Sequence, residues 1–525
     1  GSPQFKPLRP RRRRIEIEVS DDSVSNGTET DCEERRAAKQ ASRWTPGAAV
    51  VTQFGGATCR KDGDSVSPRE PYCPQDLQEA TVKSTSRITG DSLAGEVGDE
   101  YRDVRHVVLA LPPLKSKPEN AGSVAGNMYE PGDVAYVMPR NRSSAVDAFF
   151  ELMSAPYRQL RWKLMHARVV LETLSESGAD IESLGEDSVR ERRPTEVYEL
   201  RLNVRQPCSL NEIVAAHFDL NSIPTRSFVS SLANHAANPL EKSRLEEFAS
   251  EKGSDEFTMY AHREKRSILM TLRDFPSARP PLETLIAIMP RLKPRAFSIA
   301  SSPAADRGEL HICIALVKYK TALRRIREGV CSAFVRDLGP NDIVPLWIQR
   351  GSFRLSYEPA DSPLILIGPG TGIAPIRSIL RDLHAKEISA KVPRRRVLVY
   401  HGCRYDHIAD SPHARGDFLY KEELQSYQNI GLITSLRVAF SRESSQKMYV
   451  QHLIRQDAFE VGTLLLSNPN TRVLVVGSSG SMPRAVTESL RDSICVASRA
   501  QLDAETADRM LRKMASASRF CVECW

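Results

Sequence analysis

The C-terminal part of the chain alternates short, mainly apolar runs with stretches of helical periodicity. The apolar runs lie at 364–367, 397–400, 436–439 and 473–476, and a helix-like segment follows each of them. Such runs are typical of strands buried on both faces, and strands separated by helices pair in parallel. The alternation therefore predicts a doubly wound parallel sheet covered by helices over residues 356–525.

A glycine-rich turn joins the first of these strands to the helix after it. Its sequence, Gly368-Pro-Gly-Thr-Gly-Ile-Ala-Pro375, places the last proline in the first helical turn, where proline is favoured. Glycines let backbone N–H groups approach a phosphate, and the N-terminus of a helix stabilises its charge. We therefore predict that Gly370, Thr371 and Gly372 bind the pyrophosphate of a dinucleotide.

A cluster of cations and hydrogen-bond donors follows the third predicted strand. It begins directly after Phe440, at the carboxyl edge of the sheet, where open α/β sheets bind their ligands. A guanidinium, an ammonium, a phenol and an amide in one short segment suit the 2′-phosphate that distinguishes NADPH from NADH. A solvated helix start would explain the two cations alone, but it explains the group less well. The predicted contacts are Ser441, Arg442, Lys447, Tyr449 and Gln451, and the same segment includes Met448 and Val450.

The residues before this sheet have the pattern of an antiparallel barrel with a helical insertion. A strand-like run spans 103–111, and a Pro-Gly-Asp turn at 131–133 leads into a short apolar strand, as in antiparallel sheets. Helical periodicity then dominates residues 144–270, and short strands return from 295 to 356. We therefore expect a barrel domain over residues 82–355 that contains this helical insertion.

The barrel also carries a second set of residues suited to a dinucleotide. Arg295 offers a fork for a phosphate, Phe297 a ring face for a flat heterocycle, and Ser298 a hydroxyl for a ring nitrogen. The segment from Gly329 to Ser332 precedes a helix whose N-terminus suits a pyrophosphate. Two phosphate-binding turns in two differently built domains predict two dinucleotides, the alternative being two ordinary turns.

The first 81 residues differ in composition and periodicity from the rest of the chain. An arginine run at 9–14 precedes acidic, Ser-rich and Gly/Pro-rich stretches, with one strand expected at 15–19. We interpret this segment as a linker or disordered tail, whose arginines form a solvated basic patch. The net charge of +7 does not indicate nucleic-acid binding. No apolar stretch approaches the roughly 20 residues needed to span a bilayer, so no membrane association is predicted.

The ten cysteines are scattered along the chain rather than arranged as a dense disulfide framework. This distribution indicates a reducing compartment. Only Cys521-Val-Glu-Cys524 has the spacing of a metal or redox pair. One such pair without a second is a weak zinc signal, so we predict no metal site. We interpret the two as unrelated thiols of a terminal strand, with a redox dithiol as the alternative.

Together, the motifs from about Ser86 to Trp525 resemble the FAD- and NADPH-binding half of the diflavin reductases, the cytochrome P450 reductase superfamily. Pro207-Cys-Ser-Leu210, Pro345-Leu-Trp347 and the C-terminal Arg519–Trp525 are similar to the branch that serves cytosolic iron–sulfur cluster assembly. The resemblance implies a ferredoxin-NADP reductase-like fold and hydride transfer from NADPH to FAD. It also implies onward electron transfer through an FMN domain, in cis or in trans, to an iron–sulfur protein of the anamorsin type in the cytoplasm.

The resemblance also implies roles for individual residues. Ser298 would hydrogen-bond the flavin ring nitrogen N5, and Glu523 would support the proton network. Trp525 would cover the flavin ring and move aside for the nicotinamide, while Lys265 matches a basic FAD contact. The other FAD contacts match the family's Arg-x-aromatic-Ser and pyrophosphate motifs and are Arg295, Ala296, Phe297, Gly329, Val330, Cys331 and Ser332.

Three features depart from the family pattern. No Ser/Thr-rich phosphate loop of a flavodoxin-like FMN domain is found, so we expect that domain to be absent from this chain. Val476 stands where many relatives have a cysteine near the nicotinamide, and Glu523 stands where P450 reductases have an aspartate. The open alternatives are the reductase half of a P450 or sulfite reductase system, and a catalytically idle scaffold of the same fold.

Overall fold

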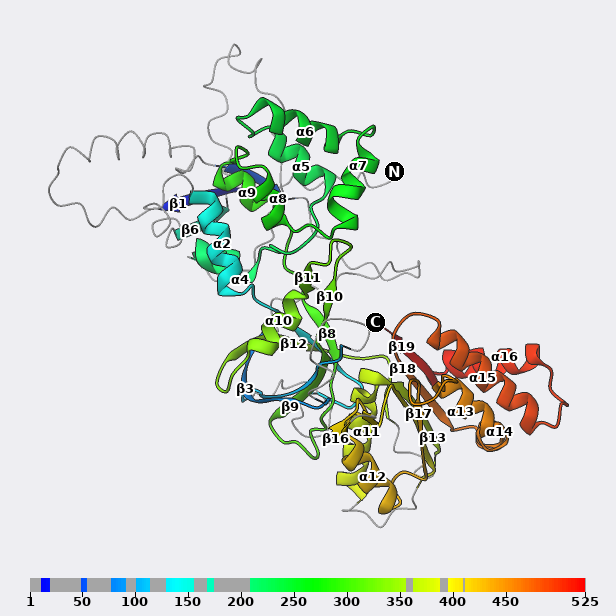
Figure 1. Cartoon of the computed structure of the whole chain (residues 1–525). Helices are drawn as coiled ribbons and strands as arrows, with labels where there is room; N and C mark the ends of the chain where they lie inside the picture. The colour runs from blue at the N-terminus through cyan, green and yellow to red at the C-terminus, as the bar shows by residue number, and fades with distance from the viewer. Residues whose placement is uncertain are drawn as a thin grey trace, which may run out of the picture. The chain divides into compact units, whose positions relative to one another are not determined.

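The structure is a computed structural model, shown in Figure 1, that divides into two compact units. The first unit contains Gly1–Pro74, Arg140–Lys293 and Thr321–Arg324, and the second contains Gln75–Pro139, Pro294–Lys320 and Arg325–Trp525. Within these units the structure describes residues 11–18, 49–53, 77–90, 101–113, 129–154, 168–173, 208–355, 362–387, 395–408 and 411–524.

The first unit is mainly helical, as the periodicity of residues 144–270 predicts. Side chains of Ser209, Thr225, Asn238 and Ser267 accept hydrogen bonds from backbone N–H groups and begin four of the helices. Large buried aromatic residues, including Phe248, pack between the helices. The helices are α2 (Ser143–Ser154), α4 (Leu210–Ala216), α5 (Arg226–Ala233), α6 (Pro239–Ala249), α7 (Ser254–Phe257), the π-helix η4 (Thr258–Arg263), α8 (Ile268–Asp274) and α9 (Leu282–Ile288).

A small antiparallel sheet completes the first unit. Its strand order is β2-β1-β6-β7, built from β2 (Ala49–Gln53), β1 (Arg11–Glu18), β6 (Arg168–Thr173) and β7 (Cys208–Ser209). Strand β1 overlaps the strand expected at 15–19. Most of the predicted tail lies outside the described residues, although strand β3 of the second unit already begins at Gln78.

The second unit contains the predicted antiparallel barrel. Its strand order is β8-β5-β12-β3-β4-β9, and a bridge between Ile299 and Ile312 joins the two ends of that order. Apolar side chains such as Val82 and Leu346 point inward and form the barrel core. The strands are β3 (Gln78–Arg87), β4 (Val104–Ala110), β5 (Val134–Val137), β8 (Arg295–Ser298), β9 (Glu309–Ala315) and β12 (Ile343–Gln349). The hairpin β10 (Lys318–Lys320) and β11 (Ile326–Glu328) leads to helix α10 (Val330–Asp337).

The second unit also contains the predicted parallel sheet. Its strand order is β17-β14-β13-β18-β19, and all four neighbouring pairs run parallel. The strands are β13 (Leu364–Pro369), β14 (Val397–Cys403), β17 (Ser435–Phe440), β18 (Arg472–Gly477) and β19 (Phe520–Cys524). The small antiparallel hairpin β15 (His407–Ile408) and β16 (Ser411–Arg415) follows β14.

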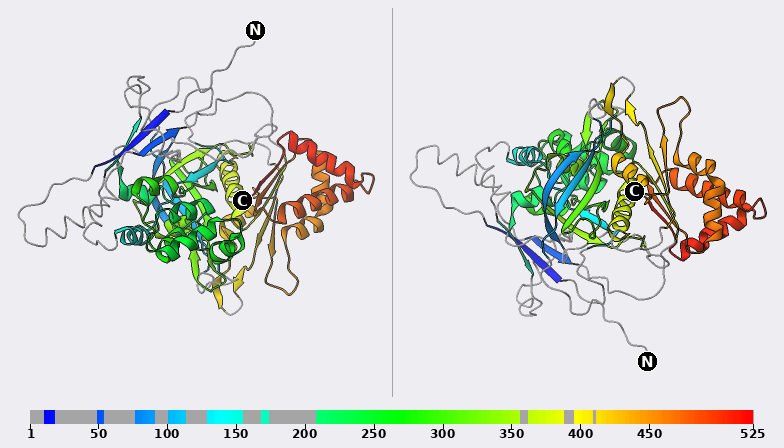
Figure 2. Two further views of the ribbon diagram at one scale, coloured as in Figure 1. Left: turned by 90° about the horizontal axis from the view of Figure 1, so that it is seen from above. Right: turned by 90° about the horizontal axis from the view of Figure 1, so that it is seen from below.

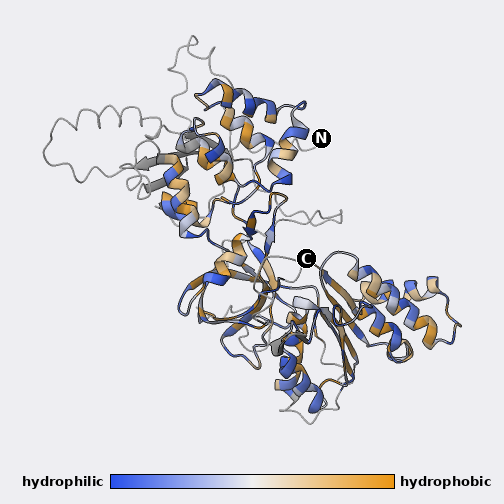
Figure 3. Cartoon of the chain, in the orientation of Figure 1, coloured by the Kyte–Doolittle hydropathy of each residue, from blue (hydrophilic) through white to orange (hydrophobic). Residues whose placement is uncertain are grey.

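Helices cover both faces of the parallel sheet, which confirms the doubly wound prediction. Helices α11 (Ile373–Glu387) and α12 (Lys421–Asn429) pack on one face around Leu366 and Val399. The other face is covered by α13 (Val450–Gln456), α14 (Ala458–Ser467), α15 (Met482–Ala497) and α16 (Ala504–Ser516), drawn in orange to red in Figure 2. Helix α12 is drawn mainly in the hydrophilic colour in Figure 3, and its buried residues include Leu424 and Tyr427. The barrel and this sheet together form a ferredoxin-NADP reductase-like fold.

Candidate dinucleotide-binding sites

The glycine-rich turn lies at the carboxyl end of the central strand β13. A short 3-10 helix, Gly370–Gly372, follows the strand, and α11 begins at Ile373, two residues before Pro375, the residue from which the sequence predicts the helix. Gly370 has a φ of +58°, and no described atom lies within 4 Å of the place where its Cβ would be. A Cβ on Gly372 would collide with the carbonyl oxygen of Val476. The turn is therefore packed against β18 on one side and open on the other, as a pyrophosphate site requires.

The donor cluster follows β17 at the same edge of the sheet. The backbone N–H and the hydroxyl of Ser441 both donate to the carbonyl oxygen of Cys403, at 2.9 and 3.2 Å. The N–H of Arg442 donates to the carbonyl oxygen of Arg404 at 3.1 Å. These bonds hold the start of the cluster beside the end of β14, at the carboxyl edge of the sheet.

The second part of the donor cluster leads into α13. Lys447 is exposed and Met448 half-buried, while Tyr449 keeps 42% of its surface exposed. Val450 and Gln451 open α13, with Val450 buried. The two parts of the site meet at Gly402, where a Cβ would lie 3.0 Å from the Cβ of Pro369 and 3.2 Å from Cγ1 of Val450. The structure thus brings the glycine-rich turn and the donor cluster together.

The FAD-type residues lie in the barrel. Arg295, Ala296, Phe297 and Ser298 form β8, and Phe297 packs against the barrel core. Gly329 is the N-cap of α10, and no side chain among the described residues caps that helix. Val330, Cys331 and Ser332 form its first turn, and the Ser332 hydroxyl accepts the N–H of Val317 at 2.8 Å. The uncapped backbone N–H groups of this turn are suited to a pyrophosphate.

Strand β8 and the first turn of α10 lie close to each other. Burial raises the pKa of the Cys331 thiol to about 12, and the positive charge of Arg295 opposes this rise. Cys331 and Phe297 of β8 also pack in the same barrel core, so the first turn of α10 and strand β8, the two halves of the predicted FAD site, share one core. A guanidinium, the backbone N–H groups at the N-terminus of α10 and an aromatic ring together fit a flavin dinucleotide.

The C-terminal strand connects the two sheets of the second unit. Glu523 pairs with Val476 on β18, and its carboxylate accepts the Ser352 hydroxyl at 2.6 Å and the Ser352 N–H at 3.2 Å. Ser352 follows β12, whose residue Gln349 is opposite Val134, and Val134 is opposite Ser298 on its other side. Glu523 therefore reaches the barrel at the end where Ser298 lies. Trp525 is outside the described residues.

Lys265 lies in the first unit. It follows the π-helix η4, has a φ of +48°, and donates its backbone N–H to the carbonyl oxygen of His262 at 3.3 Å. Its contact with FAD stays a prediction.

The Cys521 and Cys524 thiols both lie on β19. Since side chains alternate along a strand and these two are three residues apart, they point to opposite faces. Cys521 is buried and Cys524 exposed, and both thiols are free. The geometry therefore does not bring the two together as a dithiol pair.

Comparison with known proteins gives two family matches. One, described as "FAD binding domain", covers residues 119–334, and the other, "Oxidoreductase NAD-binding domain", covers residues 366–488. Similar proteins include NADPH-dependent diflavin oxidoreductase 1 of Dictyostelium discoideum, 32% identical over 79% of this chain and 59% of the relative. The protein of that name from Arabidopsis thaliana is 34% identical over 76% of this chain and 59% of the relative. The chain belongs to the diflavin reductase family.

Within that family the chain is also similar to other members. NADPH–cytochrome P450 reductase of Oryctolagus cuniculus is 30% identical over 76% of this chain and 54% of the relative. This diflavin reductase chain spans about 60% of the length of its first relatives. It contains the FAD-binding and nicotinamide-nucleotide-binding domains of an oxidoreductase. Among its described helices, none combines the length and apolar character needed to cross a membrane.

Sequence reasoning missed a polar network that joins α11 of this diflavin reductase to the barrel. Arg377, only 7% exposed, donates to the Ala300 carbonyl oxygen at 2.7 Å and to Glu423 at 2.6 Å. Arg381 donates to Asp306 at 2.8 Å and to Glu423 at 2.7 Å. Burial would raise the pKa of Glu423, but the two guanidiniums lower it below its ordinary value. The only sign of this network in the sequence is the four-residue spacing of Arg377 and Arg381. That spacing is not specific, because arginines on solvent-exposed helices often have it too.

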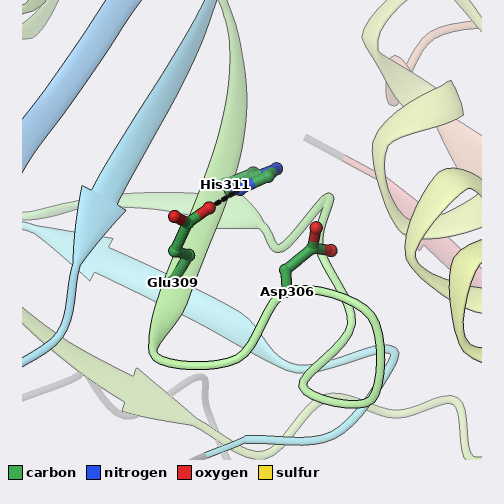
Figure 4. Close-up of side chains that lie close together, drawn as sticks. All are labelled: Asp306, Glu309 and His311. Atoms are coloured by element: carbon green, nitrogen blue, oxygen red, sulfur yellow. Dashed lines mark hydrogen bonds and ion pairs between the residues drawn. The ribbon is translucent and has the colours of Figure 1, made fainter.

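A cluster of three metal-ligand types lies beside this network (Figure 4). Asp306, Glu309 and His311 place ligand atoms within 4.8 Å of one another. Each carboxylate already has a cationic partner, since Arg381 binds Asp306 and Lys83 lies 2.7 Å from Glu309. His311 Nε2 lies 2.9 Å from the Glu309 carboxylate. The protein itself balances the charge of this cluster, which therefore belongs to the network that ties the barrel to α11.

Proposed function

We propose that the chain transfers hydride from NADPH to FAD and passes electrons on, through an FMN domain, to an iron–sulfur protein of the anamorsin type in the cytoplasm. The observation that carries the proposal is the meeting of the glycine-rich turn and the Ser441–Gln451 cluster at Gly402. One part suits a pyrophosphate and the other a 2′-phosphate. The names of the relatives in Dictyostelium and Arabidopsis agree with NADPH as the donor and with two flavins.

The residues of the parallel sheet would bind the nicotinamide nucleotide. Backbone N–H groups of Gly370, Thr371 and Gly372 would face the pyrophosphate. Arg442 would provide two parallel donors to the 2′-phosphate, an arrangement that lysine cannot offer. The Tyr449 ring, with 42% of its surface exposed, is available to stack on the adenine. The other cluster contacts would be Ser441, Lys447, Met448, Val450 and Gln451.

The barrel residues would bind and orient FAD, which when bound accepts a hydride and releases electrons to the next carrier. Arg295 and the first turn of α10 would neutralise the pyrophosphate. Ser298 would donate to ring nitrogen N5, and Trp525 would cover the ring until the nicotinamide replaces it. Lys265 would add a basic contact. The contribution of the protein is thus orientation and electrostatics.

Glu523 would act at the junction between the two sites. Its carboxylate accepts two hydrogen bonds from Ser352, which fixes the last strand against the barrel. We infer that it both holds the strand that leads to Trp525 and keeps a carboxylate near the proton network of Ser298.

Steady-state reduction of ferricyanide by the FAD-loaded chain tests the proposal. Ferricyanide accepts electrons directly, so no FMN domain is needed. We expect kcat/KM to be about 100-fold higher with NADPH than with NADH, because the 2′-phosphate adds several charge-assisted hydrogen bonds. An FAD-loaded chain with no NADPH-dependent reduction would contradict the proposal and favour the idle scaffold.

The similarity to a cytochrome P450 reductase supports a second candidate for the final acceptor. Both acceptors require the same hydride transfer, so only the last step separates them. With an FMN domain supplied in trans, we expect NADPH-driven reduction of an anamorsin-type protein and little reduction of a cytochrome P450. The reverse preference would assign the chain to the P450 branch.

A further inference from the structure

A buried histidine lies beneath the glycine-rich turn. His401, on β14, has 0% of its surface exposed, and its Nδ1 lies 2.7 Å from the carbonyl oxygen of Gly368. A carbonyl oxygen can only accept, so Nδ1 carries the hydrogen and Nε2 is an acceptor. Nε2 has no hydrogen-bond partner within the described part of the chain. One of the two ring nitrogens is thus buried without a hydrogen bond, which costs free energy. A phenyl ring at this position would not have that cost.

The hydrogen bond from His401 to Gly368 lies at the end of β13, where the chain leaves the sheet. The pairing of β13 with β18 ends at Ile367 and Val475, whereas its pairing with β14 continues to Pro369 and Gly402. Gly368 lies opposite His401 in this last segment. The carbonyl that accepts from His401 is therefore the last one before Pro369 and the turn. Any movement of that peptide would move the backbone N–H groups that follow.

Neighbouring residues pack closely around the ring of His401. Alternation along β14 puts it on the face of Val397 and Val399, beneath α11. The ring stacks on Phe418, with centroids 5.4 Å apart. Above it, the turn folds back so closely that a Cβ on Gly368 would lie 2.5 Å from the Gly372 carbonyl oxygen. The imidazole is therefore fully buried, stacked on Phe418 and hydrogen-bonded to the peptide from which the turn begins.

We propose that His401 is a positioning residue for the nicotinamide nucleotide, whose Nδ1–H fixes the Gly368 peptide and so holds the Gly370–Gly372 turn in its phosphate-receiving shape. This inference rests on the proposed function. His401 makes no contact with the nucleotide itself. Burial lowers the pKa of His401 to about 4, although the Gly368 carbonyl and Asp417 oppose this change. The ring is therefore neutral at pH 7, and its single N–H hydrogen is on Nδ1, where it donates to the Gly368 carbonyl oxygen.

Binding of two ligands to the FAD-loaded full chain tests the proposal. NADP+ uses both the turn and the donor cluster, whereas 2′-AMP has only the 2′-phosphate end and uses the cluster. His401→Phe keeps a flat ring against Phe418 but removes the donor. By calorimetry we expect it to weaken NADP+ about tenfold, the loss of about one hydrogen bond, and to change 2′-AMP affinity less than about twofold.

Two further variants complete the design. His401→Asn places an amide N–H near the position of Nδ1 and is expected to restore most of the NADP+ affinity. His401→Gln places its amide near the position of Nε2 and is expected to bind NADP+ as weakly as His401→Phe. It therefore replaces His401→Phe if that variant fails to retain FAD, which the flavin absorbance reports.

The outcomes separate this proposal from the one on which it rests. If the wild-type chain binds FAD but not NADP+, the proposed function itself fails. If the wild type binds NADP+ and His401→Phe binds it equally well, the positioning role is wrong. Equal weakening of NADP+ and 2′-AMP would also overturn it, because that result indicates general distortion of the sheet edge.

Discussion

The hydroxyl of Ser352 donates a hydrogen bond of 2.6 Å to the carboxylate of Glu523. Ser352 follows the barrel strand β12, and Glu523 lies on β19, the edge strand of the parallel sheet. The bond therefore joins the two cofactor-binding sheets two residues before the C-terminal Trp525. The family resemblance implies a role for this carboxylate in the proton network. The structure shows in addition that the carboxylate is hydrogen-bonded to Ser352 of the barrel.

The Ser352–Glu523 bond is expected to matter for hydride transfer as a unit. Ser352→Ala and Glu523→Ala should each slow flavin reduction by NADPH, by up to about tenfold, because each removes the hydrogen bond between the Ser352 hydroxyl and the last strand. The double variant should be no slower than the slower single variant, since both remove one bond. Anaerobic stopped-flow absorbance of the four proteins measures this coupling. Additive losses would show that Glu523 acts independently of Ser352.

Arg442 is expected to determine the choice between NADPH and NADH. Arg442→Ala removes the guanidinium predicted to bind the 2′-phosphate, so KM for NADPH should rise about 30-fold while kinetics with NADH change little. Ferricyanide reduction with both donors measures the effect. Arg484→Ala is the matched control, because this arginine lies on α15 with its side chain 87% exposed and pairs along its own helix with Glu488. Equal losses with NADPH and NADH in Arg442→Ala would contradict the assignment.

The buried Arg377 is expected to stabilise the second unit. Arg377→Met leaves the Ala300 carbonyl without that donor and Glu423 without one of its two arginines, which should cost about 2–4 kcal/mol of unfolding free energy. Adding Glu423→Gln should cost much less than the sum of the two single changes. Urea denaturation followed by flavin release measures the loss. A cost as small as that of Arg484→Ala, within about 0.5 kcal/mol, would show that the network contributes nothing.

Buried neutral histidines predict a loss of stability in mild acid. Burial lowers the pKa of His106 to about 3, helped by Arg377, and burial lowers the pKa of His401 to about 4. Between these values and the ordinary 6.5, the unfolded chain binds more protons than the folded one. Stability should therefore fall as pH falls through this window.

The thermal midpoint of the FAD-loaded chain at pH 7 and pH 5 measures this effect. We expect a lower midpoint at pH 5 in the wild type and a smaller decrease in His401→Phe, which removes one of the titrating groups. A decrease of the same size in both proteins would show that His401 does not contribute.

The architecture of the second unit was predictable because four strands of the parallel sheet, all except β19, contain an apolar run. The runs from Leu364 and Val473 were both identified, and the structure extends each by one or two residues. Helix α11 begins earlier than Pro375 indicates, because the 3-10 turn ending at Gly372 already directs the chain into helical geometry. Local pattern was sufficient here because burial and periodicity agree.

The polar network and the role of His401 were not predictable in the same way. Arg377 and Arg381 have the spacing of any solvated helix face, and only long-range packing places Ala300 and Asp306 against them. His401 follows an apolar run directly, and its acceptor Gly368 is 33 residues away in the sequence. Contacts of this kind depend on sheet register, which one sequence does not specify.

The most direct measurement is the anaerobic absorption spectrum of the FAD-loaded chain, recorded before and after one equivalent of NADPH and, separately, of NADH. It reports bound flavin, hydride transfer and recognition of the 2′-phosphate in one experiment. We predict rapid loss of the flavin absorbance with NADPH and a much slower loss with NADH. A flavin spectrum that NADPH leaves unchanged, or that both donors reduce equally fast, would contradict the account.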